Sequence, residues 1–238
     1  MLTVFTVGQK YKKIGILGGM GPEATAELYL KIIKIFQDKF GAKYDSDYPE
    51  IMIYNLPLPD VVEKIDQSSK IKEMLVKGVQ KLESWGVDFI AIPCNTVNFF
   101  LPEMRTAVSI PILSILEETA KEVNKLELKK VAVLGTEMTI SSGIYQKVLP
   151  DISLIVPKLE QQQEITEIIL NVLAGKKIKS DLQKLKSIIK ELKINGAEKV
   201  ILGCTELPLL IKESEDTINT IDILAKEIVK KCINLEEK

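Results

Sequence analysis

The sequence predicts an α/β protein made of two similar doubly wound domains with mostly parallel sheets. Short apolar runs rich in Ile and Val alternate with longer stretches of helical periodicity, which is the pattern of consecutive βαβ units. The two halves also begin alike, with IGILGG at 14–19 and VAVLGT at 131–136. Each half then reaches a cysteine after a later apolar run. We therefore expect an active site in the cleft between the two domains.

The first half shows this alternation from residue 12 onward. Strands are expected over 12–19, 50–55 and 87–93, because each is a short apolar run. A helix is expected over 22–40, where a proline occupies the first turn and a glutamate follows it near the positive end of the helix dipole. A second helix is expected over 68–86, beginning at two serines and stopping at a glycine.

The second half repeats the alternation. The expected strands are 129–136, 153–157 and 197–203, and the expected helices are 139–149, 160–174, 180–194 and a last one from 220. We expect the last helix to return to the first domain. The predicted division is a first domain of 13–112 plus about 214–238, a second domain of 113–213, and an N-terminal extension of 1–12.

Composition narrows the classes of function. Lys and Arg total 32 against 33 Asp and Glu, and no basic block is interleaved with aromatic residues, so a nucleic-acid partner is not expected. No apolar run approaches the roughly 18 residues that a membrane span needs, so no membrane partner is expected. Three cysteines, far apart and in no Cys-x-x-Cys spacing, argue against disulfides and a zinc site and favour a cytoplasmic protein.

The chain has no histidine. This excludes a Ser-His-Asp triad, a Cys-His pair and a histidine general base. Among the remaining groups, cysteine, with an ordinary pKa of roughly 8.5, is the nearest candidate for acid–base chemistry near neutral pH.

Cys94 and Cys204 each follow an apolar run, at the carboxyl end of an expected strand. Open α/β sheets bind ligands there, and a helix beginning just after a cysteine lowers the pKa of its thiol. A single cysteine in such a place is more often an inert core residue. Both, however, precede polar pairs that can hydrogen-bond a carboxylate, Asn95-Thr96 and Thr205-Glu206, which favours a functional pair. Cys232, in the last expected helix, has no such neighbours and is expected to be structural.

The turn LGGMGPEA at 17–24 allows two interpretations. Its glycines fit a degenerate dinucleotide-binding pattern, but Glu23 would repel a pyrophosphate. The backbone N–H groups of Gly19, Met20 and Gly21 can instead hold a single carboxylate. In the corresponding turn of the second half, Thr136 and Thr139 are candidates for a ligand contact or a helix cap, and capping is favoured for Thr139.

Several motifs together resemble the cofactor-independent aspartate/glutamate racemase family, and specifically its aspartate racemase branch. They are IGILGGMGPEATAELY, IPCNT, IPILSILEETA, TISSGIY and VILGCTELPLL, and the resemblance runs from about Lys13 to the end of the chain. It implies a homodimeric racemase that needs no PLP, other cofactor or metal. It also implies that Cys94 and Cys204 are the bases on the two faces of the substrate Cα. The residues then expected to bind the amino-acid substrate are Gly19, Met20, Gly21, Asn95, Thr96, Val97, Thr136, Gln163, Thr205 and Glu206.

The chain departs from the family pattern at the expected contacts to the substrate's side-chain carboxylate. The family's arginine position falls at Val61 and its lysine position near Gln163. Lys64 and Lys158 are the available replacements, while Arg105, the only arginine of the chain, is expected on the surface. Either a lysine takes over and aspartate remains the substrate, or the substrate has a longer or uncharged side chain.

Two further interpretations compete with a racemase. A catalytically silent homologue would bind an amino acid without exchanging its α-proton. A decarboxylase or cis–trans isomerase of the same superfamily usually differs at the cysteines, so retention of both favours racemisation.

Overall fold

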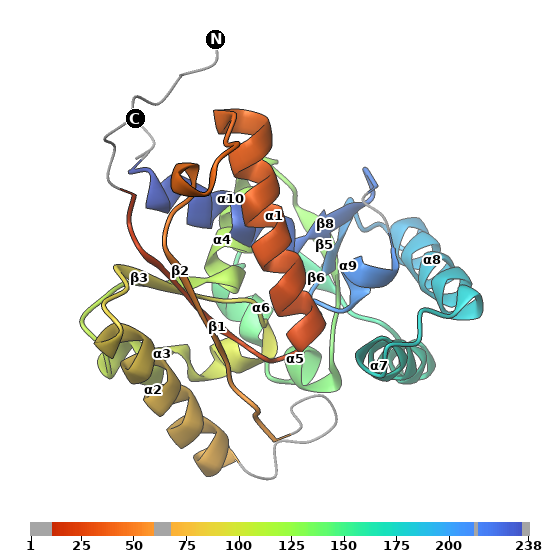
Figure 1. Ribbon diagram of the computed structural model, residues 1–238. Coiled ribbons are helices and arrows are strands. Elements are labelled where there is room, and N and C mark those ends of the chain that lie inside the picture. The colour runs from red at the N-terminus through yellow and green to blue at the C-terminus, as the bar shows by residue number, and fades with distance from the viewer. Residues whose placement is uncertain (1–10, 60–67, 212–213, 235–238) are drawn as a thin grey trace.

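The computed structural model describes residues 11–59, 68–211 and 214–234 and contains two parallel four-stranded sheets (Figure 1). The first sheet has the order β2-β1-β3-β4, with β1 (Ile14–Gly18), β2 (Ile51–Asn55), β3 (Phe89–Ile92) and β4 (Ile112–Ser114). The second has the order β6-β5-β7-β8, with β5 (Lys130–Leu134), β6 (Ser153–Ile155), β7 (Lys199–Leu202) and β8 (Thr217–Asn219). The strand orders are the same, and the predicted α/β fold with two parallel sheets is confirmed.

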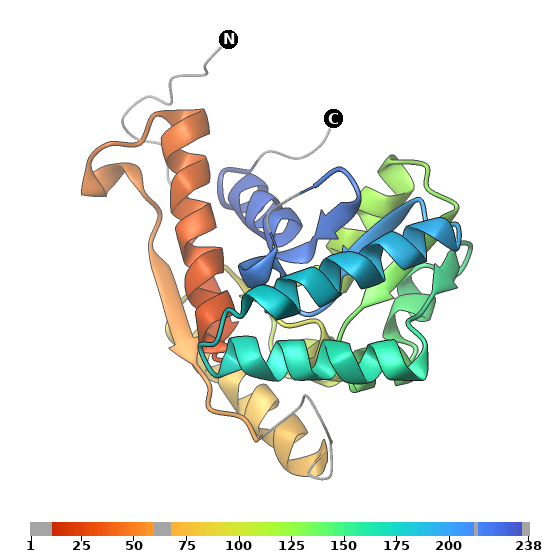
Figure 2. The ribbon, with the colours of Figure 1, turned by 90° about the vertical axis from the view of Figure 1, so that its right-hand side faces the viewer.

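Helices flank both sheets (Figures 1 and 2). In the first half and at its junction with the second they are α1 (Pro22–Phe40), α2 (Ser68–Ser84), α3 (Leu101–Thr106) and α4 (Ile115–Lys125). The remaining helices are α5 (Glu137–Ser141), α6 (Ile144–Val148), α7 (Leu159–Leu173), α8 (Lys179–Ile194), α9 (Leu207–Leu210) and α10 (Thr220–Cys232). Short 3-10 turns cover Asp45–Asp47 and Thr96–Phe100. Helix α1 begins at a proline and ends at Gly41, whose φ of 68° gives the left-handed cap that glycine favours.

The sequence expectations did not include strands β4 and β8 or helices α3, α4 and α9. The helix expected over 139–149 is split into α5 and α6, because Gly143 takes a φ of 65° between them. Strand β4 pairs with β3 in the first sheet although it crosses the expected boundary at 113. Strand β8 pairs with β7 in the second sheet although 214–238 was expected to belong to the first domain. Each of these strands pairs in parallel with its neighbour in the sheet.

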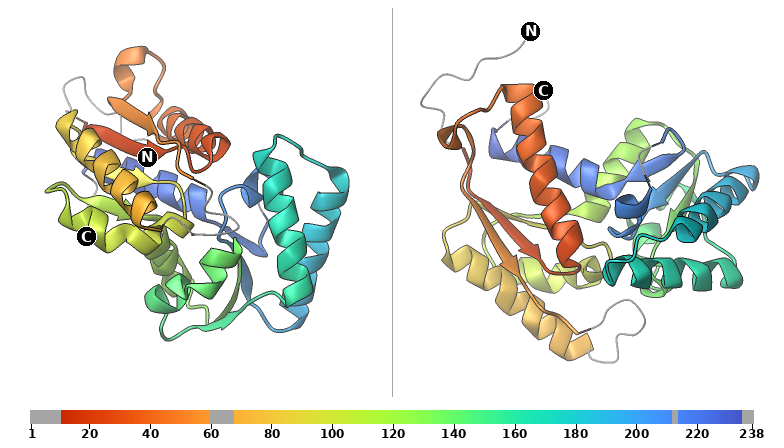
Figure 3. Two further views of the ribbon diagram at one scale, coloured as in Figure 1. Left: turned by 90° about the horizontal axis from the view of Figure 1, so that it is seen from below. Right: turned by 45° about the vertical axis from the view of Figure 1, so that its right-hand side comes forward.

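The core consists of three clusters, because side chains alternate between the faces of each strand. One cluster joins the two halves: it contains Ile14 and Ile16 of β1, Val131 and Val133 of β5, and buried residues of α1, α4, α6 and α10. The second fills the outer face of the first sheet under α2 and α3, and the third fills the outer face of the second sheet under α7 and α8. Figure 3 shows α1 and α10 between the two halves.

Helix α10 packs against both α1 and α4, so the end of the described chain contacts the first half as well as the junction. The amide of Lys12 donates to the carbonyl of Cys232 at 3.0 Å, which ties the start of the described chain to this helix. Among the described residues, no helix combines the length and the apolar character that crossing a bilayer requires.

Candidate active site

A cavity of about 190 Å³ lies at the carboxyl ends of the strands, between the two halves. Its lining comes from the segments after β1, β2, β3, β5 and β7, together with the start of α1 and the end of α7. The lining residues are Gly19, Met20, Gly21, Pro22, Leu58, Pro59, Cys94, Asn95, Thr96, Thr136, Leu173, Gly203, Cys204, Thr205 and Glu206. This volume is below the roughly 300–1,000 Å³ of pockets for drug-sized ligands, so the cavity suits a small metabolite.

Both expected cysteines line this cavity, and they are equally buried. Cys94 follows the end of β3 by two residues and is 6% exposed, whereas Cys204 follows the end of β7 by two residues and is 7% exposed. Because β3 and β7 are the third strands of sheets with the same order, the two thiols occupy equivalent places in the two halves. All three cysteines of the chain are free thiols.

Hydrogen-bond donors surround the sulfur of Cys94. The backbone N–H groups of Val97 and Thr96 and the hydroxyl of Thr96 all face it, and each lowers the pKa of the thiol. Burial acts in the opposite direction and dominates, and the negative charge of Glu206 adds to it. Together they raise the pKa of Cys94 to about 12.

The thiol of Cys204 instead donates a hydrogen bond. Its Sγ lies 2.9 Å from Oε2 of Glu206. Burial, followed by the charge of Glu206 and this hydrogen bond, raises the pKa of Cys204 well above its ordinary value. The helix starts were expected to lower both thiol pKa values. In the folded protein removal from water outweighs them.

Hydroxyl groups form a compact buried network beside Cys94. The Oγ1 atoms of Thr96, Thr136 and Thr139 lie 2.9 to 3.2 Å from one another. The hydroxyl of Thr136 also accepts the N–H of Thr139, so this residue caps α5 as well as lining the cavity. The two roles weighed for Thr136 are therefore compatible. The capping role favoured for Thr139 is wrong, because Thr139 lies within α5 and donates its N–H to the cap.

The side chain of Asn95 is fixed from two sides. Its Oδ1 accepts the hydroxyl of the buried Tyr145 at 2.8 Å, and its Nδ2 donates to Oγ1 of Thr220 at 3.3 Å. Burial raises the pKa of Tyr145, so the phenol stays protonated and remains the donor. An amide held in this way presents a defined face to the cavity.

The turn after β1 is already hydrogen-bonded within the protein at two of its amides. Gly19 donates to Oγ1 of Thr25 at 3.0 Å, and Gly21 donates to Oε1 of Glu206 at 3.2 Å. These two N–H groups were expected to hold a substrate carboxylate. In the structure they hold the turn against α1 and against the second half.

Glycine is required at this turn for space. A Cβ on Gly19 would lie 2.7 Å from the backbone of Leu56, and the φ of Gly19 is 93°. A Cβ on Gly21 would lie 2.9 Å from Oε1 of Glu206 and 2.8 Å from Leu173. The close approach of the two halves therefore depends on Gly21.

Two residues expected to bind the substrate do not line the cavity. Val97 is fully buried in the core cluster of the first sheet, and only its N–H contributes to the site, at the sulfur of Cys94. Gln163 is exposed on α7. One residue earlier, Gln162 points inward and donates to the carbonyl of Gly135 at 3.0 Å. A helix turns by about 100° per residue, so an alignment displaced by one position selects the wrong face.

The cations considered for a side-chain carboxylate are also elsewhere. Lys158 pairs with Glu191 at 2.7 Å, and its side chain is 71% exposed. Arg105 binds both carboxylate oxygens of Glu117, each at 2.7 Å, on the partly exposed surface. Val61 and Lys64 lie outside the described residues.

The structure adds cavity residues that sequence patterns did not identify. Leu58, Pro59 and Leu173 supply apolar walls, and Pro22 and Gly203 complete the lining. No chemical motif marks an apolar side chain at the end of a helix such as Leu173. Cys232 is buried away from this lining, where its thiol donates to the carbonyl of Lys12 at 3.3 Å.

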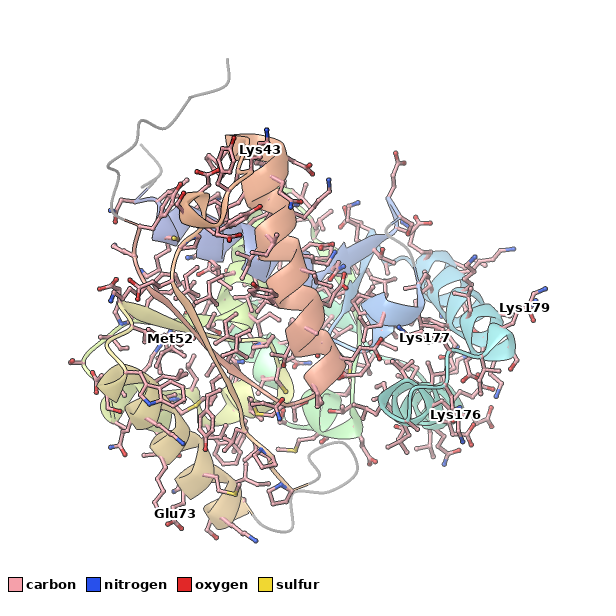
Figure 4. All side chains as sticks on the ribbon, in the orientation of Figure 1. Lys43, Met52, Glu73, Lys176, Lys177 and Lys179 are labelled. Atoms are coloured by element: carbon pink, nitrogen blue, oxygen red, sulfur yellow. The ribbon has the colours of Figure 1, made fainter. Side chains whose placement is uncertain are left out.

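An ion pair joins the two halves near the cavity. Lys177, on the segment that connects α7 and α8 and labelled in Figure 4, pairs with Glu23 in the first turn of α1. Within the described part of the chain, no three acidic, cysteine or histidine side chains gather as a set of metal ligands.

Comparison with known proteins identifies the family. Residues 17–228 match the Asp/Glu/Hydantoin racemase family. The chain is 37% identical over 220 residues to the broad specificity amino-acid racemase RacX of Bacillus subtilis (strain 168), covering 91% of this chain and 96% of that protein. Among solved structures, an aspartate racemase homologue from Pyrococcus horikoshii OT3 is 33% identical with a TM-score of 0.76 and covers 92% of this chain and 98% of that one. Picrophilus torridus aspartate racemase is 28% identical with a TM-score of 0.80, covering 93% and 94%. The chain thus belongs to the Asp/Glu/Hydantoin racemase family, and its enzyme class is that of the isomerases.

Proposed function

We propose that this protein racemises an amino acid by a two-base mechanism, in which either Cys94 or Cys204 removes the proton at Cα and the other cysteine gives a proton to the opposite face. The observation that carries the proposal is the pair of equally buried thiols, at equivalent strand ends of the two halves, lining one small cavity. Inversion of a stereocentre needs a base on one face of Cα and an acid on the other. Two thiols from opposite halves supply that pair.

The proton balance requires the two cysteines to differ in protonation state. One thiolate removes the α-proton and becomes a thiol, while the opposite thiol gives its proton to the other face and becomes a thiolate. No proton is consumed, and the roles are exchanged for the reverse reaction. The hydroxyls of Thr96 and Thr136 and the fixed amide of Asn95 are the polar groups that stabilise charge on the substrate carboxylate in the transition state.

Thiolate formation is coupled to substrate binding in this mechanism. Burial and the charge of Glu206 raise the pKa of both thiols in the empty cavity. An amino-acid substrate brings its ammonium group into the same cavity. A positive charge at that place favours the thiolate and offsets part of the effect of burial.

The lining favours substrates with neutral side chains over aspartate. Within its described part the cavity wall contains no Lys or Arg, and Leu58, Pro59 and Leu173 are apolar. A second substrate carboxylate would therefore be buried without a cation, near the carboxylate of Glu206, which costs at least about 1–3 kcal/mol. The broad specificity of the Bacillus subtilis relative supports this choice.

Aspartate is the second candidate. The structural relatives named above are an aspartate racemase and an aspartate racemase homologue, and Lys64 belongs to the segment that directly follows Pro59 of the cavity wall. A lysine from that segment would supply the missing cation.

The test is a panel of L- and D-amino acids incubated with the protein in D2O, with deuterium at Cα measured by NMR and inversion by circular dichroism. We expect exchange and inversion, faster for amino acids with neutral side chains than for aspartate. Fastest exchange with aspartate, abolished by Lys64→Ala, would support the second candidate. Thermal stabilisation by an amino acid without any exchange would identify a silent binding protein and refute the proposed activity.

We also propose a homodimer in the cytoplasm. The resemblance to aspartate racemases supports the first part, and three free buried thiols support a reducing compartment. Light scattering that gives the mass of a single chain at assay concentration would refute the proposed homodimer.

A further inference from the structure

Glu206 is a buried carboxylate whose two oxygens have different tasks. It is 5% exposed and lines the cavity. Oε1 accepts the N–H of Gly21 from the first half at 3.2 Å. Oε2 accepts the thiol of Cys204 at 2.9 Å and the hydroxyl of Thr205 at 3.3 Å. The side chain is therefore held in place by the turn of one half while it contacts the sulfur of the other.

The thiol is the donor of this hydrogen bond, since Sγ of Cys204 donates to Oε2 of Glu206. The N–H of Gly21 and the hydroxyl of Thr205 donate to the same side chain, so all three of its described partners are donors. An ionised carboxylate only accepts hydrogen bonds. Cys204 can satisfy it as a thiol and repels it as a thiolate.

Cys94 meets the opposite chemistry at the equivalent place in the first half. Burial and the charge of Glu206 raise the pKa of its thiol, but the groups that hydrogen-bond its sulfur, the N–H of Val97 and the N–H and hydroxyl of Thr96, lower it. Donors stabilise a thiolate. Since the two sulfurs are equally buried, the difference between them lies in the residue two positions after each cysteine, Thr96 and Glu206.

We propose that Glu206 is a positioning residue that holds Cys204 as the protonated thiol, so that Cys94 is the cysteine that becomes the base when substrate binds and Cys204 serves as the acid. This assignment rests on the proposed racemase function. It also explains how a protein with no histidine sets the unequal protonation that a two-thiol reaction needs.

The charges around Cys204 agree with this assignment. The charges of Glu206 and Cys94 raise the pKa of Cys204, and the charge of Cys204 raises the pKa of Tyr145. None of these groups is a cation. The backbone N–H of Glu206 also faces the sulfur and lowers the pKa of the thiol, but burial and the carboxylate outweigh it. The ion pair of Glu23 with Lys177 lies on the surface and joins the halves without entering the cavity lining.

The test is pH-dependent alkylation of the full-length protein with iodoacetamide, followed by peptide mass spectrometry to give a separate rate for each cysteine. The thiolate is the reactive form, and equal burial removes access as the cause of a difference. In the wild-type protein at pH 8 we expect Cys94 to react at least tenfold faster than Cys204.

Glu206→Gln keeps the size of the side chain and reverses the direction of its hydrogen bond with Cys204. The introduced amide oxygen still accepts the N–H of Gly21, while the amide nitrogen donates to the sulfur. We expect the ratio of the Cys94 rate to the Cys204 rate to fall at least tenfold. The pH profile of kcat/KM should also change shape. Glu23→Gln, which removes a carboxylate from the other contact between the halves, is the matched control and should leave the ratio within twofold.

Each outcome supports or refutes the assignment. If Glu206→Gln only made the cavity more accessible, both alkylation rates would rise together, so an unchanged ratio would overturn the assignment. Cys204 reacting faster than Cys94 in the wild-type protein would overturn it without any variant, even if Glu206→Gln fails to fold. Absence of deuterium exchange would instead remove the racemase function, because the alkylation rates do not depend on turnover.

Discussion

In the first half Cys94 lies two residues beyond β3, and in the second half Cys204 lies two residues beyond β7. The sheets share one strand order, and both thiols line the same cavity. Their surroundings differ nevertheless, because donors face Cys94 while Cys204 donates to Glu206. A repeated fold thus supplies two equivalent positions, and the residue two places after each cysteine makes them chemically unequal.

Removing either thiol should have the greatest effect on activity. Cys94→Ser and Cys204→Ser should each lower kcat/KM for racemisation by about 10²–10⁴-fold, the usual contribution of an acid–base group. Cys232→Ser is the control, because Cys232 contacts the carbonyl of Lys12 and not the cavity. Circular dichroism of the purified variants measures the rates. Near-full activity of Cys94→Ser in both directions would show that the two halves do not contribute equivalent groups.

The pH dependence tests whether both thiols are protonated in the free enzyme. Since burial raises the pKa of Cys94 to about 12, its thiolate fraction grows about tenfold per pH unit below that value. We expect kcat/KM to rise steadily from pH 7 to pH 9. A flat profile over this range would mean that a thiolate is already formed before substrate binds.

The same raised pKa predicts a loss of folding stability in alkali. In the unfolded chain the thiol of Cys94 has its ordinary pKa of roughly 8.5, and in the folded protein the value is about 12. Its contribution is therefore fully present below about pH 8 and is lost as the pH rises toward 12. Urea unfolding should show that the free energy of unfolding falls less from pH 8 to pH 10 in Cys94→Ala than in the wild-type protein. An equal fall in variant and wild type would contradict the predicted shift.

The glycines at the ends of β1 and β5 give a further contrast between the halves. A Cβ on Gly18 would lie 2.3 Å from Cγ2 of Thr25, whereas a Cβ on Gly135 would lie 3.1 Å from Thr139. We expect Gly18→Ala to lower the free energy of unfolding by about 1–3 kcal/mol and Gly135→Ala by less than about 1 kcal/mol.

Gly18→Ala should also lower activity, because Thr25 holds the turn through the N–H of Gly19 and the carbonyl of Gly21. Denaturant unfolding and racemisation assays measure which of Gly18→Ala and Gly135→Ala loses more stability and more activity. A larger loss of stability in Gly135→Ala would show that the tighter contact is not in the first half.

Substitution of Arg105 should have the least effect. Its bidentate pair with Glu117 is partly exposed, and such surface pairs contribute about 0–1 kcal/mol. Arg105→Ala should change kcat/KM by less than twofold for every amino acid tested, and Glu117→Gln should behave alike. A selective loss of aspartate turnover in Arg105→Ala would assign a substrate contact to the only arginine of the chain.

Strands β4 and β8 and helices α3, α4 and α9 were not predicted. The other strands and helices, the two glycine turns and the two cysteines at strand ends could be predicted from the amino-acid sequence. These features are local: a period of two or of about 3.6 residues and a glycine or proline at an element's end are all visible within a short window. Helix α1 shows this well, since the predicted range 22–40 is the range observed. The division of 139–149 at Gly143 needed a backbone angle that the sequence does not state.

Which residues meet one another depends on the packing of the two halves. Gly21 and Glu206 are 185 positions apart, and their hydrogen bond exists because the shared core brings the ends of the two sheets together. The same packing turns Gln163 outward, keeps Lys158 on the surface with Glu191, and adds Leu173 to the cavity wall. Periodicity gives the buried face of each element but not the partner of that face. The cavity chemistry therefore depends on contacts between distant segments.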